Sequence, residues 1–129
     1  MDRYVDRDKF RTLSHVFDDR CVKCGKENTP LHADHINPYS KGGISELTNI
    51  QPLCGHCNLV KHNSENIDYR KTFFARFPVD GKYKLFTRIR FLINVFWEEN
   101  GSLFIKEIVA GWNLSDEQKK ALDYELEGI

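Results

Sequence analysis

The motifs CVKC (residues 21–24) and CGHC (residues 54–57) decide how this 129-residue chain folds, and together they hold all four of its cysteines. Matched C-x-x-C motifs allow four thiolates to converge on one zinc ion. Such a closed site leaves no coordination position for a substrate, so the zinc is expected to stabilise the fold and take no part in catalysis. Two disulfides, a redox motif and buried thiols without a ligand are the alternatives. We favour structural Zn²⁺, because redox motifs rarely come in matched pairs and the first residues show no secretion signal. The four expected ligands are Cys21, Cys24, Cys54 and Cys57.

The sequence TPLHADHI (residues 29–36) predicts a strand that concentrates titratable side chains between the two cysteine motifs. In an extended segment His32 and Asp34 point to one face and His35 points to the other. The sequence NPYSKGG (residues 37–43) is typical of a turn, because its two glycines adopt backbone angles that other residues avoid. The chain must then return to the second cysteine motif through ISELTNIQPLC.

Helical patterns flank this region on both sides. Residues 6–17 predict a short amphipathic helix, and residues 58–66 should also be helical. Residues 84–100 predict a helix that is apolar on most sides, which indicates burial or an interface. Residues 102–112 fit either a helix or a strand.

A capping box predicts where the last helix begins. Ser115 is followed three residues later by Gln118, a spacing that lets each side chain bond to the backbone of the other. Gly128 is expected to end this helix.

The order C-x-x-C, HADHI, Gly-Gly, TNIQPLC and CNLVK resembles the HNH endonuclease family, and the likeness runs from about Cys21 to Arg70. The resemblance implies an α+β fold, in which a ββα-metal finger is stapled by the four-cysteine zinc site. With its N-terminal helix, this finger is expected to occupy residues 1–70. A mainly helical extension over residues 71–129 is expected to pack on it as one compact unit.

The resemblance also implies roles for the polar residues between and beside the cysteines. His35 would be the general base, and Asn49 would match the family's middle asparagine and orient the His35 ring. Asp34 would bind the catalytic Mg²⁺ or Mn²⁺ through a hard oxygen. Many members carry histidine where this chain has Asn58, but an amide oxygen also ligates magnesium. His32 fits either a site residue or a solvated side chain.

The formal net charge is zero, yet the charges are unevenly distributed. Residues 61–90 carry eight basic and three acidic side chains, whereas residues 91–129 carry three and eight. We expect the basic segment to contact DNA phosphates, with a solvated helix face as the alternative. The aromatic residues interleaved there are expected in the core. The predicted phosphate contacts are Lys61, Arg70, Lys71, Arg76, Lys82, Lys84, Arg88 and Arg90.

The resemblance, together with the basic segment, implies a metal-dependent endonuclease that hydrolyses DNA phosphodiester bonds. A non-catalytic zinc-ribbon module that binds nucleic acid or protein is the alternative, although such a module has no need for Asp-His and two asparagines at these intervals. The apolar, acidic C-terminal region would suit a homodimer contact or a partner protein. No apolar run is long enough to cross a membrane, and we expect a cytoplasmic protein.

Overall fold

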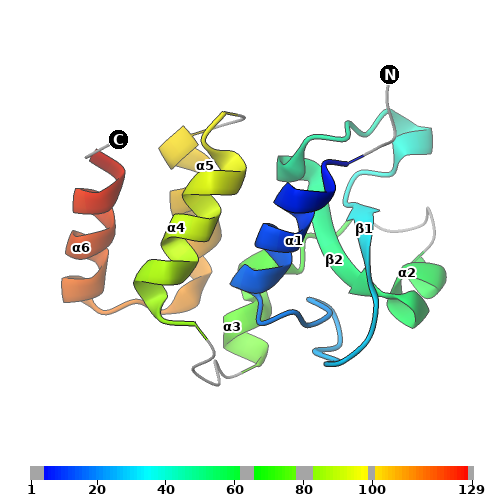
Figure 1. Ribbon diagram of the computed structural model, residues 1–129, viewed down its shortest axis with the longest axis horizontal. Coiled ribbons are helices and arrows are strands. Elements are labelled where there is room, and N and C mark those ends of the chain that lie inside the picture. The colour runs from blue at the N-terminus through cyan, green and yellow to red at the C-terminus, as the bar shows by residue number, and fades with distance from the viewer. Residues whose placement is uncertain (1–4, 62–65, 78–82, 99–100, 128–129) are drawn as a thin grey trace.

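The computed structural model describes residues 5–61, 66–77, 83–98 and 101–127, and Figure 1 shows the path of the chain. Helix α1 (Arg7–Val16) confirms the predicted N-terminal helix. The carboxylate of Asp6 accepts hydrogen bonds from the backbone N–H groups of Asp8, at 2.9 Å, and Lys9, at 3.1 Å. This cap satisfies donors that the first turn of a helix leaves unpaired.

Two antiparallel strands and one helix follow the first cysteine motif. Strand β1 (Leu31–His35) pairs with β2 (Ile50–Cys54), so that His35 lies opposite Ile50. Helix α2 (Gly55–Lys61) begins immediately after β2. The order is ββα, and the predicted mixed α+β fold is confirmed. The predicted helix over residues 58–66 starts three residues earlier than expected, and residues 62–65 lie outside the described part of the chain.

The connection between the strands contains two short 3₁₀ helices, η1 (Tyr39–Lys41) and η2 (Leu47–Asn49). Gly42 ends η1 with a φ of 87°, a left-handed conformation that favours glycine. At Gly43 an added Cβ atom would lie 1.8 Å from the carbonyl oxygen of Asn37. The tight turn predicted from the two glycines is therefore present. Gly42 is required there by its backbone conformation, and Gly43 is required by the close approach of a carbonyl oxygen.

The C-terminal half is helical. Residues 102–112, which fitted either helix or strand, are helical because their apolar side chains are buried in a helix-on-helix core. The capping box is confirmed: the Ser115 backbone N–H donates to Gln118 Oε1 at 2.9 Å, and the Gln118 N–H donates to Ser115 Oγ at 3.1 Å. Gly128 lies outside the described residues. The elements are η3 (Arg70–Thr72), α3 (Phe73–Arg76), α4 (Leu85–Phe96), α5 (Gly101–Val109), η4 (Ala110–Trp112) and α6 (Asp116–Glu127).

Helix α1 lies between the strands and α4, and it contacts both (Figure 1). The buried side of α4 includes Ile89, Leu92 and Phe96, whereas Phe86 and Trp97 are exposed. Helix α4 therefore has one buried side, and part of the apolar surface predicted to cover most of this helix is exposed. The aromatic residues that were expected in the core are buried or packed against it, namely Tyr69, Phe73, Phe74 and Phe77.

Across the described ranges, every helix is too short or too polar to cross a membrane.

Candidate functional site

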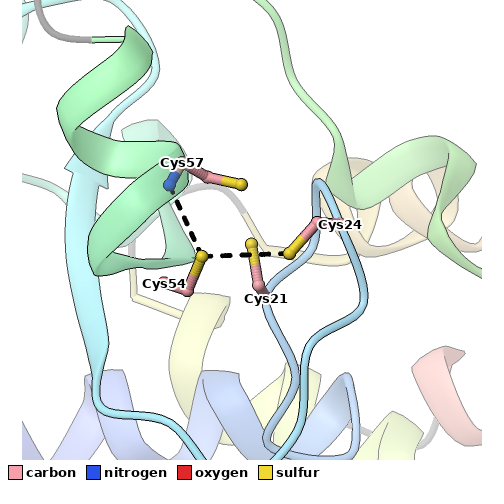
Figure 2. A group of neighbouring side chains, drawn as sticks. All are labelled: Cys21, Cys24, Cys54 and Cys57. Carbon is pink, nitrogen blue, oxygen red and sulfur yellow. Dashed lines mark hydrogen bonds between the residues drawn. The ribbon is translucent and has the colours of Figure 1, made fainter.

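The four cysteines gather where the first motif meets the end of β2 and the start of α2, as Figure 2 shows. Their sulfur atoms all lie within 4.8 Å of one another, and Cys24 Sγ is 3.8 Å from Cys54 Sγ. Sulfurs placed tetrahedrally about 2.3 Å from one zinc would lie about 3.8 Å apart. All four are free thiols, so the disulfide interpretation does not describe this structure. The donor set and its spacing are compatible with structural zinc.

The thiol groups of the cysteines differ in how readily they lose a proton. Burial acts to raise the pKa of Cys54, but hydrogen bonds from Cys57 and its other neighbours outweigh it and lower the pKa to about 7. One of these bonds is donated by the Cys57 backbone N–H at 3.4 Å (Figure 2). Burial raises the pKa of both Cys24 and Cys57. Binding of a metal by all four sulfurs would therefore expel protons from at least these two thiols.

Arg76 holds the first cysteine motif in place from α3. Its guanidinium donates to the carbonyl oxygen of Lys23 at 2.7 Å, to that of Tyr69 at 3.0 Å, and also to that of Val22. Arg76 was predicted to contact phosphate. Its side chain instead bonds to the backbone between Cys21 and Cys24, and it orders the first cysteine motif.

A cleft of about 590 Å³ opens between β1, η1 and the start of α2. Its walls bring together the predicted base His35 and the predicted metal ligands Asp34 and Asn58, and they also include His32. The imidazole of His32 is exposed and lies over Gly55, where an added Cβ would be 3.6 Å from Nε2. The remaining lining residues are Ala33, Pro38, Tyr39, Ser40, Gly55 and Leu59.

Asp34 lines this cleft and is 5% exposed. Its Oδ2 accepts a hydrogen bond from Gln51 Nε2 at 3.0 Å, and its Oδ1 lies 3.2 Å from Lys61 Nζ. Burial raises the pKa of Asp34, while the bonds from Gln51 and Lys61 act in the opposite direction. The carboxylate is therefore held in one orientation by two partners, which use two of its about four lone-pair sites.

The His35 ring is half-buried at the end of β1. Its Nε2 lies 3.0 Å from Ser45 Oγ, and the ring packs edge-on against Tyr39 with the centroids 5.8 Å apart. These contacts fix the plane of the imidazole next to the cleft. Neither Ser45 nor Tyr39 was singled out from the sequence.

Asn49 does not orient the His35 ring directly. Within the described residues its side-chain amide bonds to backbone groups of the connecting loop: Nδ2 donates to the carbonyls of Asn37, at 3.1 Å, and Ile44, at 2.8 Å. Its Oδ1 accepts from the Asn37 N–H at 2.9 Å. Asn49 therefore holds the loop at Ile44, and the residue after Ile44 is Ser45, which contacts His35. The influence of Asn49 on the His35 ring is indirect.

Burial removes three basic residues from the predicted DNA-contacting set, which corrects that expectation. Lys61, Arg70 and Arg88 are at most 2% exposed, so they point into the molecule. Arg70, for example, donates to the carbonyls of Leu47, Thr48 and Ile50 and pairs with Asp68. All three donate to backbone carbonyl oxygens inside the protein and do not face a phosphate.

The other five basic residues have different surroundings. Lys71 pairs with Glu107, and Arg76 holds the first cysteine motif as described above. Lys84 immediately precedes α4 and Arg90 lies on it; both are exposed, and their contact with DNA stays a prediction. Lys82 lies outside the described residues.

Gln51 is a site residue that the sequence reasoning missed. It is fully buried in β2, donates to Asp34 and to the Ile67 carbonyl, and accepts from the Tyr69 N–H at 2.9 Å. A polar amide inside the expected strand IQPLC was the available signal, because a buried polar side chain must find partners.

The segment with both cysteine motifs and the cleft is also the part of the chain that is similar to known proteins. Residues 21–64 match the HNH endonuclease family. The predicted family is thus confirmed over this segment, which supports a nuclease-like or nucleic-acid-binding function.

A relative is known from a cyanobacterium. Anaredoxin of Nostoc sp. (strain PCC 7120 / SAG 25.82 / UTEX 2576) is 27% identical over 62 residues, which make up 48% of this chain and 82% of that protein. This similarity does not separate a catalytic protein from a non-catalytic one. No solved structure matches the chain significantly.

Proposed function

We propose that this protein is a metal-dependent endonuclease that hydrolyses DNA phosphodiester bonds in the cleft beside β1. The observation that carries the proposal is that Asp34, His35 and Asn58 line one cleft within the segment that matches the HNH family. A binding module would have no need to place a potential base and two oxygen ligands around one solvent-accessible cavity.

The donor set of the cleft fits a hard divalent cation. Asp34 offers a carboxylate and Asn58 an amide oxygen, which are the ligand types that Mg²⁺ and Mn²⁺ prefer. The ammonium of Lys61 lies 3.2 Å from one oxygen of this carboxylate, so a divalent cation would share Asp34 with a fixed positive charge. A bound Mg²⁺ or Mn²⁺ would supply charge stabilisation at the phosphate and the leaving oxygen.

His35 is assigned the role of general base. A neutral imidazole takes a proton from water near neutral pH, and Ser45 and Tyr39 keep its ring from turning away from the cleft. Asn49 contributes by fixing the loop that presents Ser45. The four cysteines would hold structural zinc and take no part in the hydrolysis.

The direct test is to incubate purified, zinc-loaded protein with supercoiled plasmid in the presence and absence of Mg²⁺ or Mn²⁺. We expect nicked or linear product only with the divalent ion, and a chelator should stop the reaction. Binding of DNA without cleavage under any of these conditions would favour the non-catalytic zinc module.

A further inference from the structure

Lys61 carries the only fully buried ammonium in the described part of the chain, and it lies beneath the proposed catalytic site. Its side chain is 0% exposed. Nζ lies 3.2 Å from Asp34 Oδ1 and donates to the carbonyl oxygens of His35, at 3.0 Å, and Ile36, at 3.5 Å. Lysine is almost never fully buried unless it is paired. The burial of Lys61 at the end of α2 therefore depends on its pairing with Asp34.

We propose that Lys61 is a built-in counter-ion of Asp34 that weakens divalent-cation binding by the free protein. This inference rests on the proposed function, since it takes Asp34 as a ligand of the catalytic cation. A carboxylate has about four lone-pair sites, so Gln51 and Lys61 leave room for a cation on Asp34. That cation would then lie within a few ångströms of a fixed ammonium.

The charges of the site give the physical reason. The ion pair cancels the one negative charge that the carboxylate would contribute, and the amide of Asn58 contributes none. Like charges a few ångströms apart repel even in water, and they repel more strongly where solvent is excluded. A cation would therefore be held firmly only when a phosphate of the substrate adds negative charge to the same cleft.

A purely structural role for Lys61 predicts the opposite result when it is replaced. If the lysine only holds Asp34 and the end of β1 in place, its removal should loosen the ligand and weaken metal binding, as the loss of an orienting partner usually does. If it acts as a counter-ion, its removal should strengthen metal binding. The sign of the change separates the two accounts.

The experiment measures Mn²⁺ affinity of the zinc-loaded protein without DNA, from the electron paramagnetic resonance signal of free Mn²⁺. Lys61→Gln removes the charge and keeps an amide donor for the carbonyl of His35. It should bind Mn²⁺ at least about tenfold more tightly than the wild type. Lys61→Arg, which keeps the charge, and Lys106→Gln, which removes an exposed charge on α5, should both stay within about twofold. Unchanged or weaker binding by Lys61→Gln would overturn the proposal.

A second measurement covers a variant that folds poorly. The melting temperature of Lys61→Gln should rise more on addition of Mn²⁺ than that of the wild type, because a ligand that binds the folded state stabilises it in proportion to its affinity. An equal or smaller rise in the melting temperature of Lys61→Gln would overturn the proposal that Lys61 acts as a counter-ion. Adding Asp34→Asn to Lys61→Gln should abolish the gain, and a gain that persists would mean that the cation binds elsewhere.

Failure of this inference and failure of the nuclease proposal remain distinguishable. A wild type that cleaves DNA, with no tightening in Lys61→Gln, rejects the counter-ion alone. A tightening in Lys61→Gln, with no cleavage by the wild type under any metal, supports the counter-ion and rejects the nuclease.

Discussion

Arg88 and Asp18 form a buried ion pair that joins α4 to the chain just after α1. Arg88 Nη2 lies 2.7 Å from Asp18 Oδ1, and the two side chains are 2% and 3% exposed. Arg88 Nη1 also donates to the Val16 carbonyl at 2.6 Å, and Nε donates to the Tyr83 carbonyl at 2.9 Å. One guanidinium therefore connects three segments, and removing it would leave a carboxylate alone in the interior.

Arg88→Met should lower the free energy of unfolding by about 3–5 kcal/mol, because breaking a buried pair from one side leaves the partner's charge uncompensated. Arg90→Met, two residues along the same helix but exposed, is the matched control and should change stability by no more than about 0.5 kcal/mol. Urea denaturation measures both. Equal effects of the two substitutions would mean that the pair does not stabilise the contact between α1 and α4.

The elements that were predictable from the sequence are those with local causes. The cysteine spacing, the glycine pair after β1 and the capping box of Ser115 and Gln118 each act over a few residues, so the sequence alone reveals them. The family resemblance added the ββα order and the gathering of Asp34, His35 and Asn58 around one cleft, which a single-sequence pattern could not have placed together.

The fate of the basic residues could not be predicted, because it depends on carbonyl groups that are distant in sequence. Lys61, Arg70 and Arg88 are buried because backbone oxygens such as those of His35, Leu47 and Val16 need donors. Counting charges in the sequence reveals the excess of basic residues in residues 61–90, but it does not reveal which of these side chains are buried. The partners of Asn49 depend in the same way on how the loop after β1 closes.

Removal of metal should unfold the region around the cysteine motifs. Structural zinc contributes roughly 10–16 kcal/mol of apparent binding free energy, so Cys54→Ser should not reach the native fold. Reduced, folded wild-type protein should contain about one zinc per chain by elemental analysis. Folded protein without zinc, in the presence of reductant, would contradict the four-thiolate site.

Zinc binding should be linked to proton release. Burial raises the pKa of Cys24 and Cys57 in the folded site, and an unfolded cysteine has a pKa of about 8.5, so without metal both thiols are protonated near neutral pH and zinc must displace those protons. The affinity for zinc should therefore fall as the pH is lowered and rise as it is raised. Calorimetric titration in two buffers of different ionisation enthalpy should give a release of at least about two protons per zinc. A release near zero would mean that the thiols are already ionised.

Two sets of basic residues test where DNA lies. Lys41 is exposed in η1, which lines the cleft, whereas Lys84 and Arg90 are exposed just before α4 and on it. Lys41→Gln should reduce the slope of log K against log salt by about 0.9, the value for one lost phosphate contact. The double variant Lys84→Gln and Arg90→Gln tests the two contacts predicted from the sequence, and it should reduce the slope by about twice that amount. An unchanged slope in the double variant would mean that these two side chains do not contact DNA.

The two histidines of β1 should not be equivalent if the cleft is a nuclease site. His35→Ala removes the proposed base, so cleavage should fall by at least about 10²–10⁴-fold. DNA affinity and zinc content should stay near normal, because neither depends on this imidazole. His32→Ala, which alters the opposite and exposed side chain of the same strand, should cost much less. Asp34→Ala should also abolish cleavage, but high Mn²⁺ should rescue it in part.

The most direct test of the account is the rate of Mn²⁺-dependent plasmid cleavage by His35→Ala and His32→Ala, measured side by side with the wild type. The account predicts that His35→Ala is nearly inactive while His32→Ala retains most of the wild-type rate. An active His35→Ala beside an inactive His32→Ala would contradict it, and would assign the role of the base to His32.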